Sequence, residues 1–179
     1  PPPPPPPPFQ AEDGIRDQGD GLVGSEMCIR DSSHVEAIAF MENPLVIVAP
    51  PEHRLAKRKR IAQKEVEEEV FLVREPGSGT RGAMERIFRE QKLKLTTGMG
   101  MGSLTSIKQG VQAELGLGLL PRGAVRLELQ LGHLVELKVK GLPIQRHWYV
   151  VLHKGKRLSL AAEEFKSLLI DEAVDLLED

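Results

Sequence analysis

Hydroxyl groups and glycines gather in one short turn, residues 77–80, between a predicted strand and a predicted helix. The apolar run Phe71–Val73 precedes the turn, and residues 80–91 carry apolar side chains at helical spacing. A helix start exposes backbone N–H groups with the positive end of the helix dipole behind them, which suits a carboxylate or phosphate. In open α/β sheets, ligands lie beyond the carboxyl ends of strands. The pattern therefore predicts an anion site formed by Gly77, Ser78, Gly79 and Thr80.

A second hydroxyl at a helix start, Ser103, follows the glycine-rich segment 98–102, which we interpret as a turn. Two strand–turn–helix units can clamp one anion, so Gly102 and Ser103 are the predicted partners of the first turn. Arg74 and Arg81 flank the first turn and can supply charge-assisted hydrogen bonds, although their acidic neighbours can equally well neutralise them. Helix capping uses the same geometry as anion binding and remains the alternative role of both serines.

Other site chemistries have no matching pattern. The 77–80 turn fits neither the GxxxxGK[ST] phosphate loop nor the GxSxG nucleophile elbow. Segment 98–103 has a serine where the dinucleotide fingerprint needs its third glycine. The five histidines show no metal-ligand spacing, and no nucleophile–base pair is evident. We expect a protein that is not an enzyme, with no catalytic residue, no metal and no cofactor.

Composition is that of a globular protein, with 40% hydrophobic and 28% charged residues and a net charge of −2. The balance leaves no overall basic character for nucleic acid. We interpret the basic run Lys57–Arg60 as a solvated loop, because an acidic run follows it; phosphate contact is the alternative. No apolar run approaches the roughly 20 residues of a membrane helix. With a single cysteine, Cys28, we expect a cytoplasmic location.

The first 32 residues differ from the rest. Eight prolines open the chain, and the strings AEDGIRD and CIRDS resemble translated sequencing-adaptor sequence. We expect residues 1–32 to be an extraneous or disordered leader. Beyond them, strands and helices alternate, starting with the apolar run Pro44–Ala49 and ending with a helix over residues 159–170, which predicts α/β layering with a largely parallel sheet. Trp148 and Tyr149 are expected to pack in the core.

Five motifs together resemble the effector-binding, or substrate-binding, domain of LysR-type transcriptional regulators. In order they are NPLVIVAPPEHRLA, FLVREPGSGTRGAMERIF, GSLTSIKQGVQAELGLGLLP, LVELKV and LSLAAEEFKSLL, and they span about residues 41–169. The strings REPGSGTR and IQRHWYVVLHKGKRLS are similar to the subgroup that controls Calvin-cycle, or RuBisCO, operons.

The resemblance implies a periplasmic-binding-protein-like α/β fold, in which two lobes joined by crossing strands enclose an effector cleft. It assigns residues 33–50 and 138–179 to a partial first lobe with the crossing strands, and residues 51–137 to the second lobe. Arg74, the 77–80 turn and the Gly102–Ser103 helix start fall on the second lobe's side of the cleft. The first lobe's opening units and the family's N-terminal winged helix-turn-helix are missing, so we expect a fragment truncated in the first lobe.

The implied function is transcription regulation of carbon-fixation genes in response to a small anionic metabolite. DNA would be bound through the missing winged helix-turn-helix, by a homodimer or homotetramer of the full-length protein, with no membrane partner. Leu104 and Thr105 stand where the subgroup usually has a polar, acidic pair, which bears on the identity of the effector. A solute-binding protein of a transporter, which shares the fold and the cleft, is the alternative.

Overall fold

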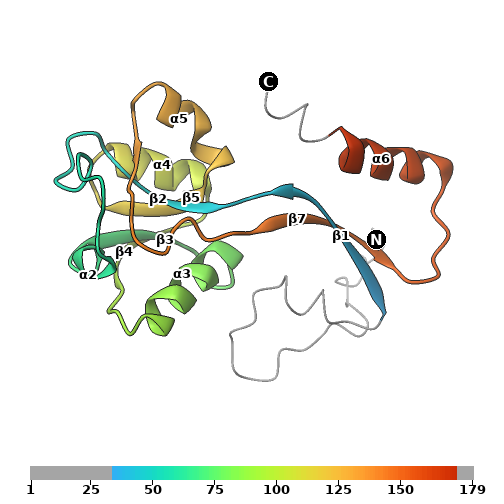
Figure 1. Cartoon of the computed structure of the whole chain (residues 1–179), viewed down its shortest axis with the longest axis horizontal. Coiled ribbons are helices and arrows are strands. Elements are labelled where there is room, and N and C mark those ends of the chain that lie inside the picture. The colour runs from blue at the N-terminus through green and yellow to red at the C-terminus, as the bar shows by residue number, and fades with distance from the viewer. Residues whose placement is uncertain (1–33, 173–179) are drawn as a thin grey trace, which may run out of the picture.

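The computed structural model describes residues 34–172 and forms a five-stranded sheet, a two-stranded ribbon and helices packed on both (Figure 1). The strands are β1 (Val35–Glu42), β2 (Leu45–Ala49), β3 (Val70–Arg74), β4 (Thr96–Met101), β5 (Leu117–Pro121), β6 (Val135–Glu136) and β7 (His147–His153). The helices are α2 (Gln63–Val66), α3 (Gly79–Glu90), α4 (Leu104–Gln112), the 3₁₀ turn η1 (Gly123–Val125), α5 (Arg126–Gln130) and α6 (Leu160–Asp171).

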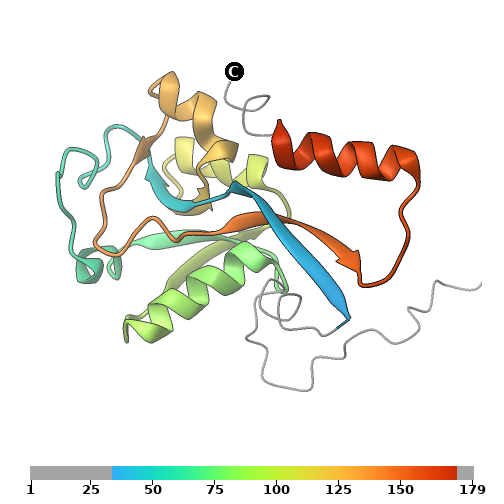
Figure 2. The same ribbon diagram turned by 45° about the vertical axis from the view of Figure 1, so that its right-hand side comes forward.

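The large sheet has the strand order β4-β3-β5-β2-β6. β3 pairs in parallel with β4 and β5, whereas β2 pairs antiparallel with β5 and β6. Four strands therefore point the same way and only β2 is reversed. Helices α3 and α4 lie on opposite faces of this sheet (Figures 1 and 2). The predicted α/β layering is confirmed, but the sheet is mixed, with two parallel and two antiparallel pairings, so the expected largely parallel sheet is only half right.

Both faces of the sheet are buried, which explains the continuous apolar strands. In β2, Leu45 and Ile47 belong to the core cluster under α3, while Val46 and Val48 belong to the cluster under α4. Every β2 side chain is at most 2% exposed. An unbroken β-branched run is typical of a strand covered on both sides, so the strand predicted from residues 44–49 is confirmed.

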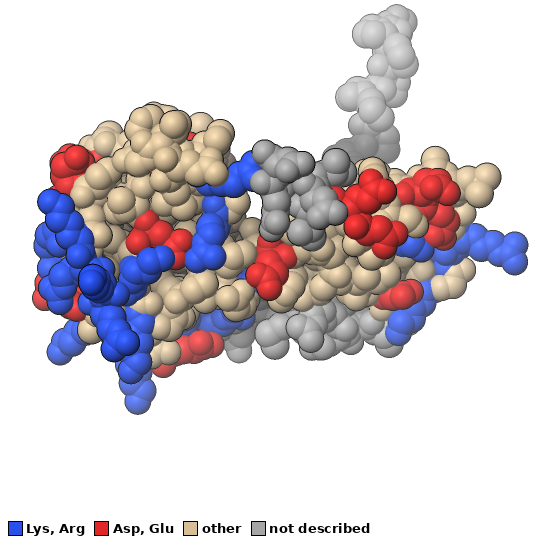
Figure 3. All heavy atoms as spheres, turned by 45° about the horizontal axis from the view of Figure 1, so that its top comes forward, with Lys and Arg blue, Asp and Glu red and all other residues tan. Residues whose placement is uncertain are grey.

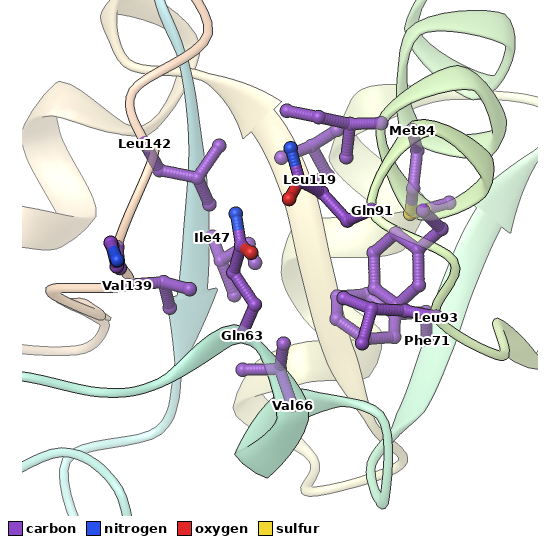
Figure 4. A pocket seen from close by; sticks show the side chains of 13 residues that line it. Ile47, Gln63, Val66, Phe71, Met84, Gln91, Leu93, Leu119, Val139 and Leu142 are labelled. Atoms are coloured by element: carbon purple, nitrogen blue, oxygen red, sulfur yellow. The ribbon is translucent and has the colours of Figure 1, made fainter.

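The core under α3 is closed by an aromatic pair. The rings of Phe71 and Phe88 meet edge to face, with centroids 5.3 Å apart and planes at 79°. Beside them lies a cavity of about 20 Å³, lined chiefly by apolar side chains such as Met84 and Leu93 (Figure 4). A space of this size holds about one water molecule. It is a packing void, too small for a metabolite.

Three elements differ from expectation. Segment 98–102 is not a turn: Gly98 lies inside β4, where a Cβ atom would stand 2.6 Å from Cγ1 of Val70, so the glycine permits close pairing of this edge strand. Strand β1 had no clear signal in the sequence because its burial pattern is irregular. Trp148 is 51% exposed, so its expected place in the core is wrong; it lies on the ribbon, outside both core clusters.

The ribbon of β1 and β7 leads the chain into and out of the large sheet. The two strands pair antiparallel, and α6 packs against β1 (Figure 2). At the junction, Asn43 N donates to the carbonyl of Arg146 at 2.7 Å, and Leu45 N donates to that of Ile144 at 2.9 Å. β2 itself lies within the large sheet, so the chain passes from the ribbon to the large sheet near residue 43.

Two expectations from the sequence concern the leader and the division into lobes. The leader predicted for residues 1–32, with Cys28, lies outside the described residues. The division into lobes, 33–50 with 138–179 and 51–137 by itself, stays a prediction. Among residues 34–172, no helix combines the length and apolar character needed to cross a membrane.

An ion pair joins the end of β5 to β6. The guanidinium of Arg122 donates two hydrogen bonds, 2.8 and 3.0 Å, to the carboxylate of Glu136, whose side chain is 16% exposed. Burial alone would raise the pKa of Glu136, but the hydrogen bond from Arg122 and the charges of Arg122 and Lys138 outweigh it and hold the pKa below its ordinary value. The carboxylate therefore stabilises the fold when ionised.

Replacing this carboxylate should make the stability of the protein depend less on pH in the acid range. Because the folded-state pKa of Glu136 is lowered, its contribution is present above the unfolded-state pKa and is lost as pH falls through the folded value. We expect Glu136→Gln to lower stability at neutral pH by about 1–2 kcal/mol and by less in acid, in urea titrations at several pH values. Glu90→Gln, at a 4.0 Å pair on the surface of α3, is the control. A loss that does not change with pH would contradict the assignment.

Candidate anion site

The carboxyl ends of β3 and β4 lie side by side, and each leads into one of the two predicted helix starts. Arg74, the last residue of β3, is in register with Met101, the last residue of β4. Because the two strands are parallel, the 77–80 turn and the Gly102–Ser103 start leave the sheet at the same edge. The structure thus brings all the sequence-predicted site residues to one end of the large sheet.

The start of α3 has no side-chain cap. Ser78 occupies the N-cap position with extended backbone, yet its hydroxyl makes no capping hydrogen bond. The first intrahelical bond runs from Gly82 N to the carbonyl of Ser78 at 2.9 Å. The N–H groups of Gly79, Thr80 and Arg81 precede this bond, and such groups have no partner within a helix. The geometry therefore leaves donors of α3 available to an acceptor from outside the helix.

The turn before α3 depends on a glycine. Gly77 has a φ of +87°, a conformation that side chains other than glycine rarely adopt, and no atom lies within 4 Å of where its Cβ would be. The backbone conformation, and not crowding, requires glycine here. This turn redirects the chain from β3 so that α3 begins next to the strand end.

The start of α4 is capped. The hydroxyl of Ser103 accepts a hydrogen bond from Ser106 N at 3.0 Å and lies 2.8 Å from the hydroxyl of Ser106. The sequence could not separate capping from anion binding, and the structure assigns the two serines different local roles. Ser103 stabilises its own helix, whereas Ser78 leaves its helix start unfilled.

Both arginines beside the turn have acidic partners. Arg74 donates two hydrogen bonds, 2.6 and 2.7 Å, to the carboxylate of Glu75, and this contact lowers the pKa of Glu75. Arg81 donates to Glu85 at 2.7 Å and to the carbonyl of Arg74 at 3.2 Å. The structure therefore shows the second role considered from the sequence, in which acidic neighbours neutralise both arginines. An incoming anion would compete with Glu75 for Arg74.

One residue that the sequence did not single out, Arg146, lies beside the start of α3. A Cβ atom built on Gly79 would be 3.7 Å from Nη2 of Arg146, so this guanidinium stands at the start of α3. Arg146 is joined to Asn43 through the backbone, and Asn43 is a buried polar residue, 9% exposed. The sequence signal that could have identified Arg146 is its position as a cation immediately before β7, a predicted crossing strand.

The large cavity among the described residues does not suit an anion. A cavity of about 330 Å³ lies at the opposite end of the strands, but its polar lining is acidic and includes Glu52, Glu68 and Glu114. Its negative charge disfavours an anionic ligand. Residues 34–172 hold no group of three or more His, Cys, Asp or Glu side chains that could bind a metal ion.

Comparisons with known proteins agree on one family. The family model for the LysR substrate binding domain matches residues 9–174. The RuBisCO operon transcriptional regulator of Allochromatium vinosum is 47% identical over 139 residues, which are 78% of this chain and 46% of that protein. The HTH-type transcriptional activator CmpR of Synechocystis sp. is 42% identical over 139 residues, 76% of this chain and 46% of that protein. The chain thus spans just under half the length of these curated relatives.

Solved structures give the same result. The regulatory domain of CcmR from Synechocystis PCC6803, in complex with 2-PG, superposes with a TM-score of 0.74 at 31% identity, covering 80% of this chain and 68% of that one. The effector binding domain of QuiR in complex with shikimate superposes with a TM-score of 0.69 at 19% identity, covering 82% and 69% of the two chains, and shows the fold alone. The expected periplasmic-binding-protein-like fold is confirmed.

Removing the carboxylate that competes for Arg74 should strengthen anion binding. An exposed ion pair contributes about 0.2–1 kcal/mol, so we expect Glu75→Gln to tighten binding by up to about fivefold. Calorimetric titration with inorganic phosphate measures the effect. Glu85→Gln, which removes the partner of Arg81, is the matched control. Unchanged or weaker binding in Glu75→Gln would show that Arg74 does not reach the anion.

Proposed function

The chain belongs to the family of LysR substrate-binding domains, and from that premise we propose that it is the part of a transcriptional regulator that binds a small anionic effector. The relatives reported above are transcriptional regulators by name. The proposed site comprises Arg74, Gly77, Ser78, Gly79, Thr80, Gly102 and Ser103, together with Arg146.

The observation that carries the proposal is the uncapped start of α3. Its N-cap hydroxyl makes no hydrogen bond to the helix, although a cap normally stabilises a helix by about 1 kcal/mol. The guanidinium of Arg146 stands beside the same helix start. Uncapped N–H groups, a helix dipole and a nearby cation all favour a bound anion. Thr80 adds a hydroxyl in the first turn of α3.

The proposed effector is an anionic metabolite linked to carbon fixation. Several relatives are regulators of the RuBisCO operon by name, and the structure of the CcmR regulatory domain contains 2-PG. For the present chain, we take 2-PG as the first compound to test. Leu104 and Thr105, at the start of α4, replace the polar pair usual in this subgroup and lie next to Ser103, so they are the positions at which effector preference would differ.

The position of the site suggests how binding would be transmitted. Thr80 belongs to a helix on the large sheet, whereas Arg146 belongs to the segment that enters the ribbon strand β7. An anion held by both would favour one orientation of the large sheet relative to whatever packs on the ribbon. A ligand shifts such an equilibrium only through its different affinity for the two orientations. The readout would be a change in how the full-length protein sits on DNA.

The remaining parts of the proposal concern the whole protein. DNA binding would reside in a winged helix-turn-helix outside this chain, the full-length protein would act as a homodimer or homotetramer in the cytoplasm, and no reaction would be catalysed. Residues 33–50 and 138–179 would contribute the crossing strands and part of a first lobe. The alternative of a transporter's solute-binding protein is not favoured, because the relatives reported are regulators.

Removing a hydroxyl from either helix start should weaken effector binding. A hydrogen bond to a charged group contributes about 1.5–3 kcal/mol, so Thr80→Ala is expected to weaken 2-PG binding about tenfold or more. Ser103→Ala should weaken it too, and should also cost about 0.5–2 kcal/mol of stability through loss of the α4 cap. Calorimetry and thermal unfolding measure the two effects.

Ser159→Ala is the matched control for the capping effect, because Ser159 caps α6 through Ala162 N at 3.3 Å. It should lower stability as Ser103→Ala does and leave 2-PG binding unchanged. In the full-length regulator, Thr80→Ala should keep its affinity for DNA. If 2-PG and inorganic phosphate bind equally well to both site variants and to the unaltered chain, the site is wrongly assigned.

A further inference from the structure

Five cations gather at the end of the molecule farthest from the ribbon, and we call this surface the basic end. It consists of side chains that are all exposed and lie on the loop after β2 and on the segment after β6: Lys57, Lys59, Arg60, Lys138 and Lys140. Figure 3 shows lysine and arginine side chains crowded over the left-hand end, where Figure 1 places this loop. The candidate anion site lies at the other end of the strands.

Backbone pairing holds the two segments of the basic end together. Ile61 and Val139 form a parallel bridge; Ile61 N donates to the carbonyl of Lys138 at 3.0 Å, and Lys140 N donates to that of Ile61 at 2.9 Å. Ile61 and Val139 are buried at 1% and 5% exposure. Alternation along an extended chain then directs Arg60, Lys138 and Lys140 outward. Arg60, Lys138 and Lys140 therefore lie on backbone that is anchored in the core.

The acidic run that follows these cations does not neutralise most of them. Glu68 and Glu69 pair with Arg54, and Glu65 pairs with Arg58. The expectation that the acidic residues cancel the whole basic run is therefore wrong for part of it. Among residues 34–172, four of the five cations have no ion-pair partner, and the fifth shares the carboxylate of Glu136 with Arg122; the four are Lys57, Lys59, Arg60 and Lys140.

The chemistry of this surface suits a phosphate backbone better than a protein partner. No large hydrophobic side chain is exposed in segments 51–64 or 138–141. Protein–protein interfaces have an apolar core with aromatic residues, whereas contacts to nucleic-acid phosphates need only spaced cations and polar groups. A net charge of −2 for the chain means that any attraction to nucleic acid must come from a local surface of this kind.

We propose that the basic end binds the phosphate backbone of duplex DNA, without regard to sequence. The contact would add to that of the helix-turn-helix and would place the effector-binding domain directly on the DNA. It rests on the proposed function only in taking duplex DNA as the polyanion at hand. Its own support is this group of exposed cations: four have no ion pair among the described residues, and three lie on the paired backbone around Ile61 and Val139.

The test is a titration of the 179-residue chain with a random-sequence duplex of about 20 base pairs, followed by fluorescence anisotropy between about 50 and 200 mM salt. The variant Lys57→Gln/Lys59→Gln/Arg60→Gln removes three charges from exposed positions. Each contacted phosphate contributes about 0.9 to the slope of log K against log salt. We expect the variant to lose about 2–3 units of slope and to bind at least about tenfold more weakly at the lowest salt.

A matched control removes the same charge elsewhere. Lys154, Lys156 and Arg157 are exposed in the loop between β7 and α6, at the other end of the molecule. The variant Lys154→Gln/Lys156→Gln/Arg157→Gln should keep the slope and affinity of the unaltered chain. An equal loss in both triple variants would mean that net charge alone is responsible, and this would overturn the proposal.

Two further outcomes would also overturn it. The first is no binding of the unaltered chain to the duplex at about 50 mM salt. The second is binding to polyglutamate as tight as binding to DNA, which would assign the surface to an acidic protein. Binding of 2-PG, measured on the same variants, keeps the two proposals separate: loss of DNA binding with unchanged 2-PG binding concerns the basic end alone, and absence of 2-PG binding concerns the proposed function alone.

Discussion

The parallel pairing of β3 with β4 is the constraint on which the candidate site depends. Phe71, Leu72 and Val73 are at most 3% exposed and contribute to the core on both faces of the sheet, so β3 cannot slip by one residue without exchanging its two buried faces. The ladder has a register shift between Phe71 and Val73, after which Arg74 lies opposite Met101. The helix starts that follow the two strands are consequently held at one edge, although 24 residues or more of chain separate them.

At that edge, stability and binding make opposite demands on a helix start. A side-chain cap satisfies the first N–H groups of a helix and removes them from any ligand. α4 has its cap in Ser103, whereas α3 begins at Ser78 without one. α3 is instead held by its packing, because Met84 and Phe88 are buried against the sheet at 2% and 4% exposure. The helix can therefore leave its first donors open without depending on a cap for its position.

Charge is arranged differently at the two ends of the large sheet. Near the uncapped helix start, Arg74 and Arg81 are each bound to a nearby carboxylate, whereas the guanidinium of Arg146 stands beside Gly79. At the basic end, Arg54 and Arg58 form ion pairs with nearby carboxylates. The neighbouring cations are exposed. The chain has a net charge close to zero, yet it has cationic groups at two separate places: beside the uncapped start of α3 and at the basic end.

The sequence alone was sufficient for the fold class and the family, because these depend on local patterns: the buried β2 run, the amphipathic α3, the Ser159 cap and the ordered motifs. It also located both helix starts. It assigned the glycines of β4 to a turn, because only the close contact between Gly98 and Val70 shows why a strand there needs a glycine at position 98. Tertiary structure decided which serine caps its helix, that Arg146 lies beside Gly79, and which cations the acidic run neutralises. Each of these is a contact between side chains or segments whose distance in space the order of residues does not specify.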